Sequence, residues 1–202
     1  MRIGRLNTRT IALIIVFAAL AIVLNPAISG IGVPFFSQIY NVWEIAIMVA
    51  FLLMGFKSGI SAALLNAAFL FSVYPGPSRA LFPLVNTLAV SGMMVGIYFA
   101  NKLTRKNSQG QNLSKARKIT LYTALAIAFR LIVMLPIVYT LLHYNIGATP
   151  PSESAIFMIA FPLQTFYNAT ITLYTVPVAY FIAKTVGKNL KAGTYVSRQE
   201  YL

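Results

Sequence analysis

The chain of 202 residues contains no cysteine, a single histidine and only three acidic residues. Without cysteine, disulfides, thiolate zinc sites and cysteine nucleophiles are excluded. One histidine, His143, cannot build a histidine-based metal site. Only one of the acids, Glu44, falls inside an apolar segment, which excludes catalysis by a buried pair of carboxylates. We therefore expect no catalytic residues, no bound metal and no cofactor, and interpret the chain as a protein that is not an enzyme.

Several motifs that would power or gate transport are also missing. The sequence has no P-loop, so the chain cannot hydrolyse ATP by itself. It has no acidic ring or TVGYG-like segment typical of a channel filter. Internal repeats and several ion-coupling acids, which secondary transporters usually have, are not evident. Charged residues make up only 9% of the chain, whereas a soluble domain has roughly a quarter.

Hydrophobic residues make up 58% of the chain and are gathered in six long stretches. A membrane-spanning helix needs about 20 mostly apolar residues. We therefore predict an all-α membrane protein, a compact bundle of six transmembrane helices that forms a single domain over residues 1–202. The expected helices cover residues 10–28, 40–55, 59–74, 81–101, 119–142 and 155–184. A polar turn over residues 55–59 joins the short second and third helices, and Pro162 and Pro177 predict that the last helix starts late or bends.

Sixteen Lys and Arg residues give the chain a net charge of +13. Fourteen of them lie at the N-terminus, in the 55–59 turn, in a loop at about 102–118, or around the C-terminal tail at about 185–202. In a six-span protein these segments share one side, and positive charge marks the cytoplasmic side. Both termini are therefore expected in the cytoplasm of a multi-pass cell-membrane protein. Because these charges flank apolar spans rather than forming a surface patch, nucleic-acid binding is not expected.

Small residues recur at helical spacing in three of the expected helices. Gly92 and Gly96 form a GxxxG pattern, which lets two helix backbones approach closely. Similar stripes are Ser58, Ala62 and Asn66, and Gly59, Ala63 and Ala67. We interpret these stripes as internal packing, with contact to another membrane subunit as the alternative. The first helix offers a small-residue surface of Ala12, Ala18, Ala19 and Ala21 that suits either purpose.

Three charged residues depart from the cytoplasmic pattern: Glu44, Arg79 and Arg130. Asn41 and Glu44 have the spacing of a capping box at a helix start, and they are equally placed to line a ligand site with Trp43. Arg130 lies deep in its helix, where its partner is Glu44, a backbone carbonyl or a ligand. Arg79 falls in a Gly/Pro loop, either at the membrane interface or as a cap over a pocket.

Further polar and aromatic side chains interrupt the apolar helices. Each buried amide taken alone is expected to bond across helices. Together with aromatic rings, they supply the flat walls and the oriented donors and acceptors that a small organic ligand needs. These residues are Asn86, Gln164, Tyr167 and Asn168, with Tyr139, Tyr144 and Trp43 as aromatic walls. The outer connections 29–39, 74–79 and 143–154 are rich in Gly and Pro and are expected to fold over such a pocket.

With short second and third helices, the chain resembles the substrate-binding S component of energy-coupling factor (ECF) vitamin transporters. The best local match is the segment 41–66, with a polar and acidic start, an apolar run, the turn at Gly55 and a small-residue helix. The segment 161–168, Phe-Pro-Leu-Gln-Thr-Phe-Tyr-Asn, is similar to the start of the family's last helix. The family's Ala-x-x-x-Ala docking motif is absent, because no two of the first-helix alanines are four residues apart.

The resemblance implies a protein of a prokaryotic cell membrane that binds a vitamin-type molecule from outside. Its outer loops would close over the ligand, and the protein would associate, within the lipid bilayer, with a coupling transmembrane subunit and two ATPases that topple it. Docking is assigned to Ala12, Ala18 and Ala19. The substrate-binding residues are Asn41, Trp43, Glu44, Arg79, Asn86, Arg130, Tyr139, Gln164, Tyr167 and Asn168.

The sequence leaves more than one candidate for the ligand and for the class of function. One acid and two arginines favour an anionic, flat or zwitterionic ligand. Riboflavin is the first choice and thiamine the second, whereas biotin or pantothenate would use an arginine. The alternative functions are a small secondary transporter with Glu44 as proton carrier, and a ligand-free membrane scaffold or assembly protein.

Overall fold

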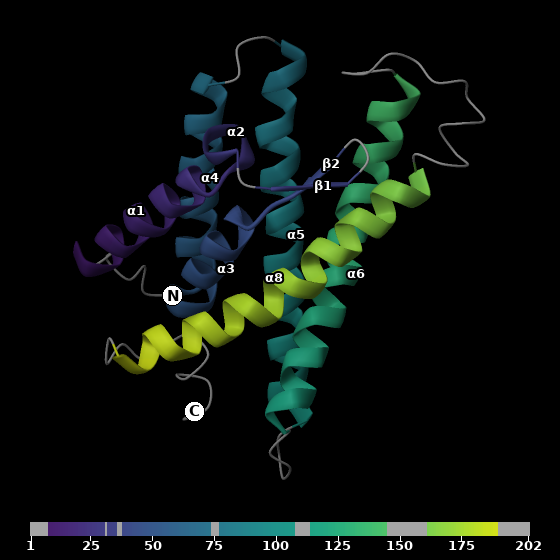
Figure 1. Cartoon of the computed structure of the whole chain (residues 1–202). Helices are drawn as coiled ribbons and strands as arrows, with labels where there is room; N and C mark the ends of the chain where they lie inside the picture. Colours follow the sequence, from purple (N-terminus) through teal and green to yellow (C-terminus); the bar gives the residue numbers. More distant parts are fainter. Residues whose placement is uncertain are drawn as a thin grey trace. The chain divides into compact units, whose positions relative to one another are not determined.

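The computed structural model describes residues 8–30, 32–35, 38–73, 77–107, 114–144 and 161–189. This part of the chain is helical apart from one short ribbon (Figure 1). The elements, in chain order, are α1 (Thr8–Val23), α2 (Pro26–Ser29), β1 (Val33–Phe35), β2 (Gln38–Tyr40), α3 (Trp43–Met54), α4 (Phe56–Val73), α5 (Pro77–Asn107), α6 (Lys115–His143) and α8 (Phe161–Asn189). The expected start of the last helix at 155 and the expected tail beyond 189 lie outside the described residues.

The first expected helix, 10–28, is interrupted in the structure. The helix α1 ends at Val23, and a separate turn, α2, begins at Pro26. Proline has no backbone N–H to donate to the preceding turn. The helix ends instead in a tighter turn, in which the N–H of Asn25 donates to the carbonyl of Ile22, three residues earlier, at 3.1 Å. The prediction of one continuous helix was therefore wrong at its end.

A single residue, Gly55, separates α3 from α4. It has φ +94° and ψ −179°, a backbone region that only glycine adopts readily. Its N–H donates to the carbonyl of Phe51 at 2.8 Å, and its own carbonyl accepts from the N–H of Gly59 at 3.1 Å. The expected five-residue turn over 55–59 was therefore wrong, because α4 already begins at Phe56.

The expected outer loop 29–39 contains an antiparallel two-stranded ribbon that the sequence analysis did not predict. Its register pairs Val33 with Tyr40 and Phe35 with Gln38. Pro34 lies opposite Ile39 in this pairing. Proline is tolerated there because each strand of a two-stranded ribbon keeps one unpaired edge.

A second loop prediction also changes. The segment 74–79 was expected as a loop, but α5 begins at Pro77, so Arg79 lies in the first turn of a helix. Proline is favoured at the first helical position because its missing N–H would have had no helical partner there.

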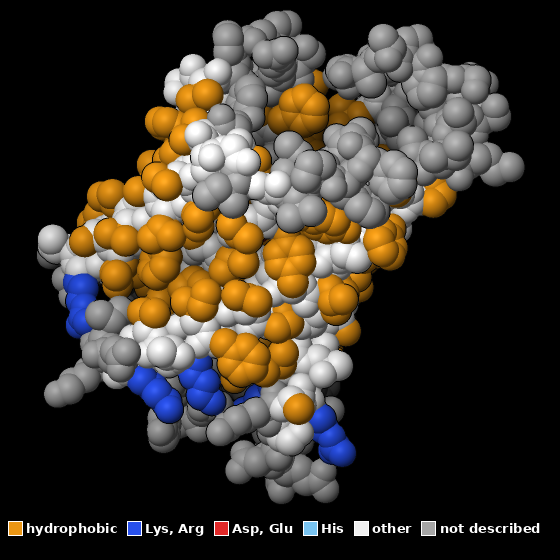
Figure 2. Space-filling model, viewed as in Figure 1, with side chains coloured by type: hydrophobic (Ala, Val, Ile, Leu, Met, Phe, Trp, Pro, Cys, Tyr) orange, Lys and Arg blue, Asp and Glu red, His pale blue; other side chains and the backbone are white. Residues whose placement is uncertain are grey.

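Four described helices are long and apolar enough to cross a membrane. These stretches are Phe56–Val73, Leu81–Thr104, Ala116–Leu141 and Phe161–Lys188. The helices α1 and α3 are apolar but shorter, with 16 and 12 residues. Many large hydrophobic side chains are exposed to the surroundings, as expected for helices that face lipid, and they dominate the surface in Figure 2. The chain is therefore a helical protein with membrane-spanning character and four candidate spans.

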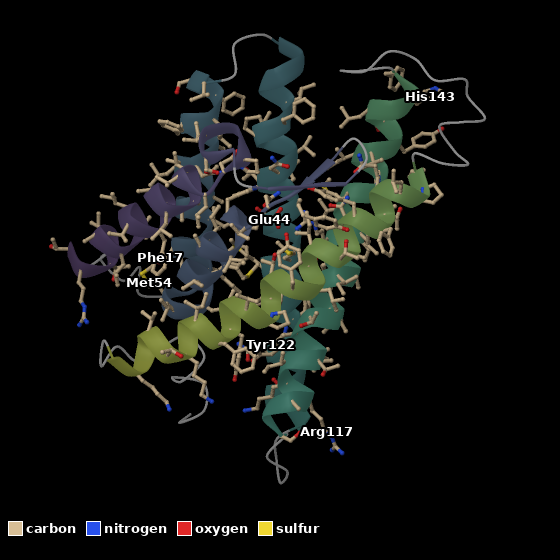
Figure 3. All side chains as sticks on the ribbon, viewed as in Figure 1. Phe17, Glu44, Met54, Arg117, Tyr122 and His143 are labelled. Atoms are coloured by element: carbon tan, nitrogen blue, oxygen red, sulfur yellow. The ribbon has the colours of Figure 1, made fainter. Side chains whose placement is uncertain are left out.

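The chain packs as two compact units. Unit 1 comprises residues 1–69 and 178–202, and unit 2 comprises residues 70–177. In unit 1, α1 packs against α3 through small side chains. Ile14 and Ala18 of α1 share a buried cluster with Ala50 and Ala62, and Phe17 and Met54 close its edge (Figure 3).

In unit 2, α5 and α6 lie side by side (Figure 1). The GxxxG pattern lies on this contact. A Cβ on Gly96 would collide with the carbonyl of Leu125 and lie 2.8 Å from the Cα of Ala126. A Cβ on Gly92 would lie 3.3 Å from the Cα of Arg130. Internal packing, the favoured interpretation of this motif, is thus confirmed.

Candidate functional site

Arg130 lies at the middle of α6. It is 13 residues from Arg117 and 13 from His143, which lie at opposite ends of this helix (Figure 3). At 1.5 Å per residue, each end is about 20 Å away along the axis. The side chain is only 3% exposed. A guanidinium at this depth cannot reach either end of the helix, so its surroundings within the protein determine what it does.

Two neutral side chains from neighbouring helices hold this guanidinium. Its Nε donates to Oδ1 of Asn168 on α8 at 2.9 Å. Its Nη1 donates to Sδ of Met93 on α5 at 3.3 Å. The first bond is a strong charge-assisted one, whereas a thioether is a weak acceptor. Arg130 thereby joins three helices within unit 2.

The orientation of Asn168 is fixed from its other side. Its Nδ2 donates to the backbone carbonyl of Gln164, one turn earlier on α8, at 2.9 Å. With the amide nitrogen engaged there, Oδ1 is the atom turned toward Arg130. The side-chain amide of Asn168 therefore orients the plane of the Arg130 guanidinium. It does so because Nε, the nitrogen it binds, is the one through which the guanidinium is attached to the rest of the side chain.

The GxxxG motif explains how Met93 comes to contact Arg130. Gly92, the residue before Met93, lies directly against the backbone of Arg130 and of Phe129. The absence of a side chain at Gly92 lets α5 approach α6 closely at this level. The next side chain, Met93, is fully buried and places its sulfur against the guanidinium.

A stripe of polar side chains runs along the buried face of α8. Asn168, Thr172 and Thr175 are each almost fully buried. Their spacing of four and three residues places them on one side of a helix. The hydroxyl of Thr172 donates to the carbonyl of Asn168 at 2.9 Å. The hydroxyl oxygen of Thr175 is buried and has no hydrogen-bond partner among the residues that the structure describes.

In unit 1, Trp43 and Glu44 are buried in the first turn of α3, each 2% exposed. Glu44 is labelled in Figure 3. A carboxylate in a first helical turn is favoured by the helix dipole. The capping-box prediction for Asn41 and Glu44 was wrong, because the N-cap residue is Val42 and no side chain caps the helix. The structure thus leaves a buried acid and a buried indole side by side in the chain at the start of α3.

Asn66 on α4 is a second buried group that the sequence analysis placed in a packing stripe. Ser58, Ala62 and Asn66 are all buried, as are Ala63 and Ala67 on the neighbouring stripe. Both stripes therefore pack inside the protein, as the sequence analysis favoured. The side-chain oxygen of Asn66, however, has no hydrogen-bond partner among the described residues.

The remaining candidates differ in burial. Tyr167 is buried beside Asn168 on α8, and Gln164 and Asn86 are half-buried. Tyr139 is 45% exposed and stacks on the imidazole of His143 at 5.6 Å between ring centroids. Tyr144 is also exposed and meets the same imidazole edge-on. The side chain of Arg79 lies outside the described part of the structure.

The proposed docking alanines do not share one environment. Ala18 is buried in the cluster with Ala50 of α3, so its methyl group is not on the surface. Ala12 and Ala19 are exposed on α1. A surface for a partner on this helix would therefore include Ala12 and Ala19 but not Ala18.

Two features of the polar interior were missed by the sequence analysis. One is Met93, which has no polar signature in a sequence and is found only through its contact with Arg130. The other is a buried bond between α5 and α6, in which the hydroxyl of Tyr122 donates to Oδ1 of Asn101 at 2.7 Å. The signal for that pair was present, because an amide and a phenol each interrupt an apolar helix.

No group of acids and histidines that could hold a metal ion occurs within the described residue ranges. No match to the chain was found among protein-family models, curated proteins or solved structures. The site is therefore judged on its own residues.

Proposed function

We propose that the protein is the substrate-binding S component of an ECF-type transporter, a six-span membrane protein with both termini in the cytoplasm. It binds a water-soluble vitamin or a related small molecule from outside the cell. A coupling transmembrane subunit and two ATPases then deliver the molecule to the cytoplasm. This function agrees with the resemblance of segments 41–66 and 161–168 to the family.

The observation that carries the proposal is the buried guanidinium of Arg130. An arginine near the centre of a bilayer costs about 2.5–3.5 kcal/mol on insertion scales, so such residues usually serve a function. Here it contacts Asn168, which lies within a turn of Gln164 and Tyr167 on α8. Small residues and neutral polar side chains suffice to hold the helices of a scaffold protein together, so a scaffold has no need for a charged group at this depth.

The binding step uses the groups already in place. Asn168 holds the guanidinium in one orientation, so the ligand meets a donor group that needs no reorganisation. Aromatic side chains of the same helices provide the apolar contacts of a small-molecule site. The chain supplies no energy-coupling chemistry, and the partner ATPases drive release.

Ligand binding by the purified protein tests this function. We expect calorimetry or co-purification to detect tight binding of at least one of riboflavin, thiamine, biotin and pantothenate. We expect Arg130→Gln to weaken that binding at least tenfold. The control is Arg117→Gln, which removes an equal charge from the exposed end of the same helix and should bind as the wild type does. Absence of binding to all four compounds would contradict the proposal.

The buried carboxylate of Glu44 favours one second candidate, a secondary transporter that carries protons on this residue. That function requires uptake by the chain alone. Vesicles that contain only this protein and no ATPase would accumulate substrate along a proton gradient, and Glu44→Gln would abolish the uptake. The S component, by contrast, binds its ligand in such vesicles without accumulating it.

A further inference from the structure

Two prolines interrupt the helices of the α5–α6 pair near the same end. Pro83 lies inside α5, and Pro136 lies inside α6. A proline has no N–H to donate to the carbonyl four residues earlier, so each helix lacks one backbone hydrogen bond at this place. Proline is also a common cause of a sharp bend in a helix. Each helix is therefore weakened where its proline lies.

A threonine one turn after each proline weakens the same place further. Thr87 donates its hydroxyl to the carbonyl of Pro83 at 2.8 Å, and Thr140 donates to the carbonyl of Pro136 at 2.8 Å. A hydroxyl bonded to the carbonyl four residues earlier slightly destabilises a helix and often bends it. The same combination thus occurs in both helices, whereas Pro177 in α8 is not followed by a threonine at that spacing.

The two weakened places lie at nearly the same level of this antiparallel pair of helices (Figure 1). A Cβ on Gly92 would lie 3.3 Å from the Cα of Arg130, so these two residues are level with each other. Pro83 is nine residues before Gly92, and Pro136 is six residues after Arg130. At 1.5 Å per residue, the two prolines differ in level by about 4.5 Å, which is less than one helical turn. The helices can therefore bend at both prolines in one motion.

The prolines divide the pair into a tightly packed part and two short ends. At Gly92 and Gly96, α5 lies so close to α6 that an added Cβ would meet backbone atoms. Beyond the prolines remain residues 77–82 of α5 and 137–143 of α6, which contain no glycine. We call these two stretches the end segments and the rest of the pair the clamped part.

An apolar cluster lies where the end segment of α6 meets the clamped part. Its members are Ala89, Met134 and Val138, which are buried, and Val85, Ile137 and Phe161, which pack against them. Val138 belongs to the end segment, whereas Ala89 and Met134 belong to the clamped part. Met134 lies about one turn from Arg130 along α6. A bend at Pro136 therefore carries Val138 out of the cluster and opens the layer of side chains next to Arg130.

We propose that the two end segments bend together about Pro83 and Pro136 and act as a gate over the polar layer around Arg130. In the closed state, which the structure shows, Val138 fills its place in the cluster. In the open state, the end segment of α6 moves away and admits solvent and solutes to the cluster. The motion is a property of the helix pair alone, and only its use for ligand entry rests on the proposed function.

The labelling of single introduced cysteines measures the opening, because the chain has no native cysteine. Val138→Cys places a thiol on the end segment of α6, at a position that is 8% exposed. Thr123→Cys is the matched control, because it lies on the clamped part of the same helix at a position that is 6% exposed. For the purified protein in detergent, we expect a maleimide to modify Val138→Cys about tenfold faster, since local opening exposes only that thiol.

Substitution of the prolines tests whether they are the hinges. Pro136→Ala and Pro83→Ala each restore a backbone N–H and stiffen the helix. We expect each change to slow the labelling of Val138→Cys about fivefold, the effect of one net backbone hydrogen bond on the opening equilibrium. Pro177→Ala makes the same change in α8 and should alter that rate by less than about twofold. The rate for Thr123→Cys should stay the same with all three substitutions.

Several results would overturn the gate. One is equal labelling of Val138→Cys and Thr123→Cys, and another is an unchanged rate for Val138→Cys with Pro136→Ala. Equal slowing at both cysteines would show that the proline acts on unfolding of the whole protein. An effect of Pro136→Ala without one of Pro83→Ala would overturn the joint motion. Failure of all four vitamins to bind would instead overturn the proposed function, and the labelling rates would still decide the gate.

Discussion

Arg130 carries a positive charge at the centre of an apolar helix, and it donates hydrogen bonds to the neutral side chains of Asn168 and Met93. None of the described residues of that unit is acidic. A carbonyl oxygen and a thioether stabilise a charge by their dipoles, and each such contact is weaker than an ion pair. The bond from Arg130 to Asn168 is therefore expected to contribute to the stability of the protein.

A double-mutant cycle measures the strength of that bond. Asn168→Leu leaves Nε of a buried charge without its amide acceptor, so we expect the free energy of unfolding in detergent to fall by about 1.5–3 kcal/mol. Arg130→Leu removes the charge and the need for the acceptor. The double variant should therefore be more stable than the sum of the two single effects predicts, by about 1–3 kcal/mol.

Leu173→Ala, a change on the exposed face of α8, controls for a nonspecific effect of substitution on that helix. Strict additivity of the Asn168 and Arg130 effects would show that the hydrogen bond contributes nothing to folding.

At the scale of elements, the close approach of α5 and α6 depends on two glycines that are not equivalent. A Cβ on Gly96 meets backbone atoms of Leu125 and Ala126. A Cβ on Gly92 would lie at 3.2 to 3.3 Å from backbone atoms of Phe129 and Arg130 and from a valine methyl group, a tight contact that requires a shift of only a few tenths of an ångström. Alanine substitutions at Gly92 and Gly96 can therefore be compared directly, each serving as the control for the other.

We expect Gly96→Ala to destabilise the protein by about 1–3 kcal/mol, because the helices must separate to admit the methyl group. Gly92→Ala should be close to neutral, since a small shift is offset by the higher helix propensity of alanine, worth about 1 kcal/mol. Thermal unfolding in detergent distinguishes the two variants. A larger loss at Gly92 than at Gly96 would contradict the packing described here.

The sequence predicted the elements better than their junctions. Each apolar stretch contains a helix because hydrophobic runs of that length have few other solutions in a membrane. The predicted helix ends near Pro26, Gly55 and Pro77 were wrong, because the backbone preference of a single residue determines where each helix begins or ends. The ribbon β1–β2 depends on pairing between strands, which a single-strand pattern of three residues does not reveal.

The candidate site was predicted in part, for a related reason. Arg130 and Asn168 were found because polar groups in apolar helices are conspicuous. Their bond to each other could not be derived, since it depends on how α6 and α8 are rotated. Met93 and Thr175 were missed because neither residue type is unusual in such a helix. Their importance lies in one weak acceptor and one unmade hydrogen bond, both of which require atomic positions.

At the scale of the whole molecule, the lack of cysteine makes the proposed topology easy to test. Single cysteines at exposed positions can be introduced without removing native ones. We expect His143→Cys to react with a membrane-impermeant maleimide in intact cells. Arg117→Cys and Lys188→Cys should react only after permeabilisation, because α6 and α8 lie between them and return the chain to the same side.

Reaction of Arg117→Cys in intact cells would show that the orientation is inverted. Reaction of Arg117→Cys and Lys188→Cys from opposite sides would rule out the six-span arrangement altogether.

The single-residue junction at Gly55 bears on how the protein enters the membrane during its synthesis. The 12 residues of α3 extend for about 18 Å, less than the roughly 30 Å hydrocarbon thickness, so α3 is a poor anchor by itself. A linker of one glycine is too short for α3 to enter the lipid separately before α4 has been synthesised. We therefore expect the translocon to release residues 43–73 as one helical hairpin, with Lys57 retained in the cytoplasm. A nascent chain that ends at Gly55 would then fail to integrate this segment.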